Sequence, residues 1–225
     1  IIRTKDLYWD VSFNLGYNKN EITYLPDGDE LTSQATAVGY PYRNWYLREW
    51  AGVDSQTGTP LWFKVDENGK KTVTGDYNEA TRVLLDEVPT PKFNGAISTN
   101  LTWKGFTLNA NFTFTTGAMI YNGQRAGAID RDCGRNSQPP MKLNDGGNNG
   151  ADRESTRYLE NGDYFKLKSL SLAYSFPKRW LEPLGVKSAN LSVGGENLFT
   201  ITSFSGQDPE ILYSADYNGS AGSFG

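Results

Sequence analysis

Residues 93–116 alternate apolar and polar side chains with a period of two on both sides of Lys104-Gly105. A turn at this dipeptide places the two kinds of side chain on opposite faces. The apolar face then pairs Trp103 with Phe106, Leu101 with Leu108, Thr99 with Ala110, Ile97 with Phe112 and Gly95 with Phe114. The polar face pairs Thr102 with Thr107, Asn100 with Asn109, Ser98 with Asn111 and Ala96 with Thr113. Because a slip of one residue would invert every side chain, the pattern predicts an antiparallel hairpin in this register.

The rest of the chain carries further strand patterns. Residues 7–17 alternate cleanly, with Trp9 and Phe13 on the apolar side. Residues 164–176 change phase near Lys168-Ser169, and a β-bulge there would bring both halves onto one face. The other predicted elements are strands at residues 44–53 and 189–199, a small separate hairpin of residues 61–65 with 70–74, and a connector at residues 177–188 with one helical turn.

The connections between these strands alternate in length from residue 53 onward. The longest, residues 117–162, is rich in Gly, Asn and Asp and has no sustained periodicity, which predicts a loop without regular structure. A structureless loop of this length is uncommon in a compact soluble domain. Long loops at one end and tight turns at the other are typical of outer-membrane β-barrels. Residues 18–43 do not fit this count, because they are long but fall on the side of the tight turns.

The class of fold depends on the medium that each face of the hairpin meets: water, lipid or a protein core. Within the hairpin the only charged residue is Lys104, although a soluble surface normally carries about 25 to 35% charged residues. Aromatic residues lie at both ends of the apolar face. Ten residue steps of about 3.3 Å, tilted by about 45°, rise roughly 23 Å, close to the ~25 Å apolar band of a membrane barrel. We therefore expect the apolar face to meet lipid; the alternative is a β-sandwich that buries this face in a protein core.

Composition excludes several classes of function. The chain of 225 residues has 22 basic and 26 acidic side chains with no basic block, so nothing indicates nucleic-acid binding. It has no histidine and one cysteine, Cys133, which removes Ser-His-Asp and Cys-His catalysis, internal disulfides and cysteine zinc sites. We expect no enzyme activity, no metal site and no cofactor. The chain starts without Met or a signal peptide, so we interpret it as a piece of a longer protein.

Three motifs resemble those of one family. They are Gly52-Val53-Asp54 with Thr57-Gly58, then Tyr158-Leu159-Glu160-Asn161-Gly162-Asp163-Tyr164 leading to Leu167-Lys168, and Glu196-Asn197-Leu198-Phe199 followed by Gly206-Gln207-Asp208-Pro209-Glu210. In order and spacing, over nearly the whole chain, they are similar to the carboxy-terminal part of SusC/RagA-type TonB-dependent transporters of Bacteroidetes outer membranes. The resemblance implies an all-β fold: an antiparallel transmembrane β-barrel segment with long extracellular loops, from the C-terminal strands of a barrel of about 22 strands. Residues 1–225 would then lack the plug domain, the earlier strands and the last strand.

The resemblance also implies a function and partners. Transporters of this family import oligosaccharides or peptides across the outer membrane, driven by TonB and covered by a SusD-like surface lipoprotein. This chain would supply barrel wall and extracellular loops in contact with outer-membrane lipid, and TonB would act through the absent amino-terminal region. The alternative function is that of a secreted carbohydrate-binding β-sandwich module.

The loop of residues 117–162 is the best candidate for contact with substrate or lipoprotein, because loops on a rigid wall carry recognition. Its candidates for binding sugar hydroxyls or peptide termini are Arg125, Asp130, Arg131, Asp132 and Arg135. Trp62 and Tyr121 are candidates for stacking on a sugar ring. The alternatives are a solvated loop with internal ion pairs, and packing or interfacial roles for the two aromatic residues. Residues 27–30 and 145–152 offer oxygen ligands for calcium, but neither stretch has the spacing of an EF-hand or its closing bidentate Glu.

Overall fold

The computed structural model describes residues 1–26, 36–129 and 153–210. They form two compact units. The strand unit comprises residues 1–18, 91–117 and 163–203, and the loop unit comprises the described residues of 19–90, 118–162 and 204–225. None of the helices in the described part of the chain is long and apolar enough to cross a membrane.

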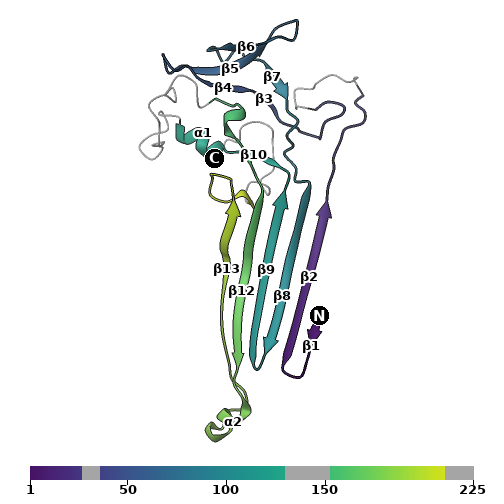
Figure 1. The fold of residues 1–225 in the computed structure, drawn as a ribbon, viewed down its shortest axis with the longest axis vertical. Helices are drawn as coiled ribbons and strands as arrows, with labels where there is room; N and C mark the ends of the chain where they lie inside the picture. The colour runs from purple at the N-terminus through teal and green to yellow at the C-terminus, as the bar shows by residue number, and fades with distance from the viewer. Residues whose placement is uncertain (27–35, 130–152, 211–225) are drawn as a thin grey trace. The chain divides into compact units, whose positions relative to one another are not determined.

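The strand unit is one antiparallel sheet in the order β1-β2-β8-β9-β12-β13, whose long strands lie side by side in Figure 1. The strands are β1 (Ile2–Arg3), β2 (Leu7–Tyr17), β8 (Phe93–Trp103), β9 (Phe106–Thr116), β12 (Tyr164–Ser175) and β13 (Asn190–Thr202). The predicted hairpin is confirmed in register, from Trp103 opposite Phe106 to Phe93 opposite Thr116. Lys104 and Gly105 have φ angles of 47° and 91°, the two positive values that a type I′ turn requires.

The connections of this sheet correct one predicted strand. β2 pairs with β8 along its whole length, from Leu7 opposite Trp103 to Tyr17 opposite Phe93. Residues 44–53 therefore lie outside this sheet, and they form two short strands in the loop unit instead of one barrel strand. The whole segment from β2 to β8 becomes one long connection. The long connections then leave one end of the sheet and the tight ones the other, which removes the misfit of residues 18–43.

A bulge across neighbouring strands keeps the apolar face continuous. β12 accommodates one extra residue, Lys168, between its pairs with Phe112 and Asn111 of β9. In the same step β13 accommodates two, Asn197 and Leu198. Asn197 has a φ of 52°, a left-handed conformation that Asn adopts more readily than most residues. The predicted phase change is thus confirmed as a bulge, and the apolar side chains on both sides of it face one way.

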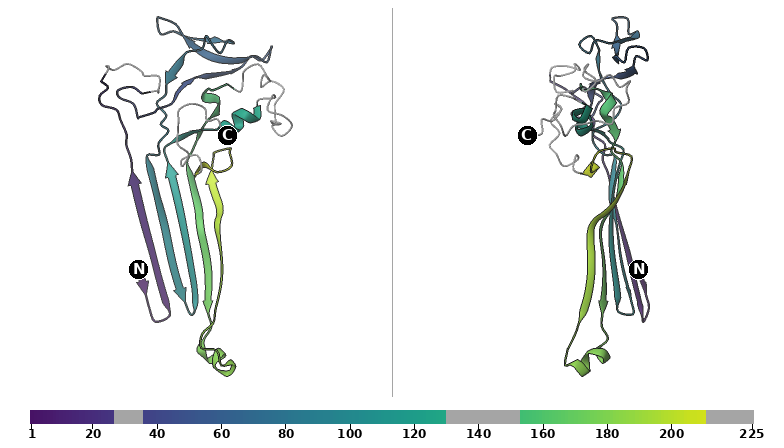
Figure 2. Two further views of the ribbon diagram at one scale, coloured as in Figure 1. Left: turned by 180° about the vertical axis from the view of Figure 1, so that it is seen from behind. Right: turned by 90° about the vertical axis from the view of Figure 1, so that its left-hand side faces the viewer.

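Neither face of the sheet is covered by a second layer from the described residues of the strand unit (Figure 2). On the outer strands, apolar-face side chains are largely exposed, with Phe13 at 60% and Val193 at 69%. On the inner strands, Ile97 and Phe112 are half-buried by neighbours such as Phe165, whose ring centroid lies 5.4 Å from that of Phe112. A β-sandwich would bury this face under a second sheet, so the described layer does not support that alternative.

The connector from β12 to β13 contains α2 (Lys178–Leu181) and the 3₁₀ turn η3 (Glu182–Leu184). This confirms the predicted short helical turn. β13 continues three residues beyond the predicted end, because Thr200 and Thr202 still pair with Lys166 and Tyr164 of β12.

The loop unit holds short strands, the helix α1 (Gly123–Ile129) and the 3₁₀ turn η2 (Thr156–Tyr158). β3 (Tyr46–Arg48) pairs with β7 (Arg82–Leu84), and β10 (Met119–Tyr121) pairs with β11 (Leu159–Asn161). A third, three-stranded sheet has the order β4 (Trp50–Val53), β5 (Pro60–Val65) and β6 (Lys71–Thr74), with β5 in the middle. The predicted hairpin of residues 61–65 with 70–74 is confirmed, with Val65 opposite Lys71. The prediction that residues 117–162 lack regular structure is wrong for their described ends, which form β10, α1, η2 and β11.

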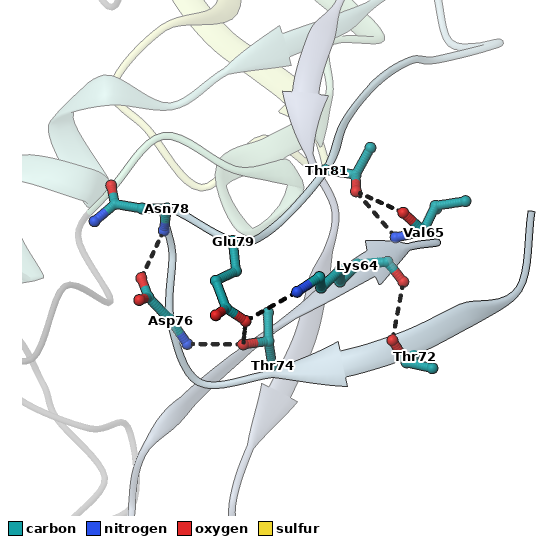
Figure 3. A network of polar contacts seen from close by, with 8 residues as sticks. All are labelled: Lys64, Val65, Thr72, Thr74, Asp76, Asn78, Glu79 and Thr81. Atoms are coloured by element: carbon teal, nitrogen blue, oxygen red, sulfur yellow. Dashed lines mark hydrogen bonds and ion pairs between the residues drawn. The ribbon is translucent and has the colours of Figure 1, made fainter. Parts of the chain in front are cut away.

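The β5–β6 hairpin is tied to the segment that follows it, as Figure 3 shows. Lys64 Nζ lies 3.1 Å from Glu79 Oε2, and the N–H of Val65 donates to Thr81 Oγ1 at 2.9 Å. Asp76 Oδ1 accepts the backbone N–H of Asn78 in the turn itself at 2.8 Å. These bonds hold the turn after β6 against β5.

Candidate functional site

Glu160 on β11 gathers side chains from separate segments of the loop unit. Its Oε2 accepts the backbone N–H of Ser205 at 2.7 Å, and its Oε1 accepts the Ser205 hydroxyl at 2.8 Å. Oε1 also accepts Arg125 Nη1 at 3.0 Å and Asn122 Nδ2 at 3.2 Å. The carboxylate therefore joins β11 to the start of α1 and to the segment that begins at Phe204.

Burial and hydrogen bonding act in opposite directions on the pKa of Glu160. Burial raises this pKa, whereas the N–H and hydroxyl of Ser205, the Arg125 guanidinium and the Asn122 amide lower it. The four hydrogen bonds prevail, so the pKa lies below that of an ordinary glutamate. Because donors to a carboxylate stabilise its charged form, Glu160 is an anion at neutral pH.

Asn122 positions Arg125 by capping α1. Its Oδ1 accepts the backbone N–H of Arg125 at 2.9 Å, and its own N–H donates to the carbonyl of Tyr158 at 2.8 Å. Asn is among the residues preferred at this position, because its side-chain oxygen satisfies an N–H that the first helical turn leaves unpaired. The Arg125 guanidinium is thus held on Glu160 while 46% of the side chain stays exposed.

Aromatic rings form a continuous cluster within the loop unit. The ring of Tyr121 lies 6.2 Å from that of Trp45 and 6.0 Å from that of Tyr158. Trp50 packs against the core pair of Ala126 and Tyr158 and lies edge-on to Trp62 at 5.7 Å between centroids. The two residues predicted to stack on a sugar, Tyr121 and Trp62, are therefore linked through this packed core.

Arginine side chains lie on Trp50 of this cluster and on Tyr77, whose ring centroid lies 5.3 Å from that of Trp62. Arg48 and Arg153 lie over Tyr77, with guanidinium carbons 4.2 Å and 4.9 Å from the ring centroid, and Arg157 lies 4.5 Å over Trp50. Such cation–π contacts hold long side chains in place. Guanidinium groups fixed beside aromatic rings provide donors for carboxylates and hydroxyls next to apolar faces.

Glu154 is an acidic neighbour of these arginines. Its Oε2 lies 3.2 Å from Arg82 Nη2, and its backbone carbonyl accepts the Tyr77 hydroxyl at 2.9 Å. Burial raises the pKa of Glu154 above that of an ordinary glutamate, and the attraction of Arg82 and Arg48 offsets only part of that rise. The charged form of Glu154 is therefore less favourable here than in water.

The structure places the predicted site residues as follows. Trp62 is 1% exposed and packs edge-on against Trp50 and Tyr77, which matches the packing alternative. Tyr121 is half-buried among its rings, and Arg125 is paired with Glu160. A role in substrate contact stays a prediction for all of them. The other candidates, Asp130, Arg131, Asp132 and Arg135, lie outside the described residues, as do Cys133 and residues 27–30 and 145–152.

Sequence reasoning did not single out Asn122, Ser205 or the arginines on Tyr77 and Trp50 as site residues. Glu160 belonged to a quoted motif, but its partners lie 35 to 45 positions away in sequence, where no spacing rule connects them. Within the described residues, no group of three or more acidic and cysteine side chains is arranged to hold a metal ion.

The amino-acid sequence of the chain is similar to those of known TonB-dependent receptors. No family model matches the chain. The chain is 30% identical over 253 residues to TonB-dependent receptor P3 of Formosa agariphila and 26% identical over 251 residues to TonB-dependent receptor SusC of Bacteroides thetaiotaomicron. Each match covers 96% of this chain but 24% and 23% of the two relatives. The chain thus spans about a quarter of the length of the curated relatives it matches.

Solved structures agree with these matches. The RagAB peptide transporter aligns with a TM-score of 0.69 and 29% identity, and the RagAB peptide importer in its open-open state with 0.71 and 30%. Both alignments cover 93% of this chain and 25% of the other. The fold is therefore that of the antiparallel strand wall of a TonB-dependent transporter barrel. The chain is a homologue of the SusC/RagA-type TonB-dependent receptors, which confirms the resemblance seen in its motifs.

Proposed function

We propose that this chain supplies part of the barrel wall and the extracellular loops of an outer-membrane, TonB-dependent importer of oligosaccharides or peptides. In this proposal residues 1–225 are a carboxy-terminal part of the barrel, and the plug and the earlier strands belong to the remainder of the protein. The chain carries out no catalysis. Its wall and loops shape the path and the binding surface, and the work of transport is done by the plug coupled to TonB.

The observation that carries the proposal is a single-layered sheet with one apolar face and one polar face. Amide and hydroxyl side chains predominate on the polar face, which also carries Asp10, Lys166 and Glu196. The apolar face is open on its outer strands, where Phe13 and Val193 are more than half exposed. Thr99 lies on this face, and its hydroxyl accepts Trp9 Nε1 at 2.9 Å. A hydroxyl that faces hydrocarbon needs such a partner, because lipid offers none.

The polar face supports a hydrated interior. Its side chains bond to one another across strands, as in the bond from Asn111 Nδ2 to Ser169 Oγ at 2.7 Å. Amide and hydroxyl groups without net charge suit a lumen wall that neutral sugars or peptides pass, and alternation of this kind is the rule for barrel strands.

The loop unit is the proposed recognition region. It contains the long connections of the sheet, and loops of that kind carry the binding residues of a rigid scaffold. Arg125 and Tyr121 remain the described candidates for substrate contact, and a SusD-like lipoprotein is the proposed partner of this unit. The RagAB neighbours are named as a peptide transporter, which favours testing peptides beside oligosaccharides.

Alternate cysteine labelling along β2 tests the membrane placement. In the protein that carries this chain, with Cys133→Ser as background, Ser12→Cys and Phe13→Cys place one thiol on each face. In outer-membrane vesicles we expect a water-soluble maleimide to modify the first thiol, and only a lipid-soluble maleimide to modify the second. Protection of the Phe13→Cys thiol from both reagents would indicate a protein core and refute the proposal.

Uptake by cells tests the transport role. Cells that contain the protein should accumulate labelled oligopeptides or oligosaccharides, and cells from which it is deleted should not. A protonophore should abolish the difference, because TonB-dependent import draws on the proton gradient. Equal uptake with and without the protein, for both classes of solute, would contradict the proposed function.

A further inference from the structure

The connector between β12 and β13 exposes more apolar surface than a hydrated turn needs. Trp180 is 53% exposed, Leu184 73% and Val186 42%. The β8–β9 turn at the same end of the sheet needs only two residues, and the N–H of Ser175 donates to its Gly105 carbonyl at 2.9 Å. The longer connector is therefore not required to reverse the chain. Figure 1 shows α2 beyond the strand ends on this side.

The connector is built to hold these side chains in fixed positions. The N–H of Val186 donates to the carbonyl of Leu181 at 3.2 Å, and that of Gly185 to the carbonyl of Glu182 at 3.0 Å. These two bonds, with Gly185 at a φ of 68°, form a Schellman motif. Leu181 is buried inside the turn. The exposed apolar side chains are thus held by a turn whose backbone is fixed by hydrogen bonds.

Aromatic rings lead from the apolar face of the sheet to this connector. Phe106 and Tyr174, both on that face, lie 4.5 Å apart between centroids. Tyr174 lies 5.1 Å from Phe176, and Phe176 lies 6.5 Å from Trp180. The apolar face therefore continues without a break onto Trp180. Whatever medium covers the apolar face also reaches the connector.

Charged side chains on the connector indicate which layer of that medium the connector meets. Lys178, Arg179 and Lys187 are exposed and stand against a single acidic residue of the connector, Glu182. Aromatic rings combined with basic side chains are favoured at the boundary between hydrocarbon and headgroups, because the ring is buried while the cation reaches the phosphates. The same combination occurs at the neighbouring turn, where Lys104 Nζ lies 5.3 Å from the centroid of Trp103.

We propose that residues 176–188 form a lipid-binding element that lies in the headgroup layer and prefers anionic phospholipid. The inference rests on the proposed membrane placement of the sheet. Trp180 and Leu184 enter the boundary of the hydrocarbon, and the three basic side chains bind lipid phosphates. The lipid partner is phosphatidylglycerol, or a lipid whose headgroup has the same charge, in the leaflet on the tight-turn side of the barrel.

Quenching of tryptophan by brominated lipid tests the position of the connector. The protein that carries this chain is reconstituted in phosphatidylcholine vesicles with brominated acyl chains, and the signal of Trp180 is taken as wild type minus Trp180→Phe. We expect strong quenching of Trp180 by the lipid and weak quenching by aqueous acrylamide. Trp9→Phe provides the matched control, because Trp9 lies on the apolar face of β2.

The Trp9 control distinguishes a failure of the inference about the connector from a failure of the proposed membrane placement. If Trp9 is quenched by the lipid and Trp180 is quenched only by acrylamide, the connector is hydrated and the inference is overturned, although the proposed function stands. If Trp180 resists both quenchers while Trp9 responds to lipid, a protein segment covers the connector, which also overturns it. If neither responds to lipid, the membrane placement itself fails.

Lipid preference is tested by moving the bromine. In mixed vesicles, brominated phosphatidylglycerol should quench Trp180 severalfold more than its mole fraction predicts, because each basic side chain near an anionic surface favours binding by about fivefold at most. In the variant with Lys178, Arg179 and Lys187 replaced by Gln, quenching of Trp180 should fall to the level that the mole fraction of brominated phosphatidylglycerol predicts. Quenching of wild type in proportion to mole fraction would refute the preference for anionic lipid.

Discussion

Replacement of Glu160 by Gln tests whether the carboxylate holds the segment that begins at Phe204 against the described ends of the long loop. Glutamine has the same shape but offers one oxygen, and its best placement puts that oxygen where Oε1 accepts from Ser205 Oγ, Arg125 and Asn122. The amide nitrogen then faces the N–H of Ser205, which loses its acceptor at 2.7 Å. A hydrogen bond to a charged group contributes about 1.5–3 kcal/mol, and we take the lower value because Ser205 is exposed.

Amide hydrogen exchange measures this change at the affected residue. A loss of about 1.4 kcal/mol accelerates exchange about tenfold, so the Ser205 amide in Glu160→Gln should exchange about tenfold faster than in the wild type at neutral pH. The lowered pKa of Glu160 means that its stabilisation is present above the ordinary glutamate pKa and is lost as pH falls through the lowered value. After correction for intrinsic rates, protection of Ser205 should decline over that acidic range in wild type but not in the variant.

Glu79→Gln is the matched control. Glu79 is also a paired glutamate of the loop unit, but its side chain is 53% exposed beside Lys64, where ion pairs contribute about 0–1 kcal/mol. It should leave the exchange of Ser205 unchanged. Equal exchange of Ser205 in wild type and Glu160→Gln, or an equal acceleration in Glu79→Gln, would refute the reasoning.

Other predictions concern the sheet and the buried glutamate. Gly95→Ala should lower the free energy of unfolding by about 1–3 kcal/mol in urea titrations of the reconstituted protein, because a Cβ would collide with the backbone carbonyl oxygen of Asn14 and with Phe114 Cζ, the latter at 2.6 Å. Asn197→Val should cost about 1–2 kcal/mol in the same assay, because its φ is 52°, whereas Asn197→Gly should be tolerated. The raised pKa of Glu154 means that stability is lost as pH rises through that value, so the free energy of unfolding in urea should increase as pH falls toward the ordinary glutamate pKa, and Glu154→Gln should remove this part of the pH dependence.

The strand unit could be predicted closely because its information is local. Alternation fixes the face of each residue, the Lys104-Gly105 turn fixes the register, and the phase change at Lys168 reveals the bulge. The strand at residues 44–53 was placed wrongly because aromatic residues on both sides give no preferred face, and its two halves pair with different partners in the loop unit. The Glu160 contacts could not be predicted, because they join positions far apart in sequence through the folding of irregular segments.

The motifs that carry the family resemblance have a common physical basis in this structure: they set backbone geometry. Asp54 Oδ1 accepts the N–H groups of Gln56 and Thr57 at 2.9 Å each, in a turn with Gly52 at a φ of 108°. Asn197 supplies the left-handed residue of the bulge, and Glu160 fastens the described ends of the long loop. None of these roles involves a substrate. Proteins that share such anchors can therefore share a wall while differing in the residues between the anchors, where we expect specificity to lie.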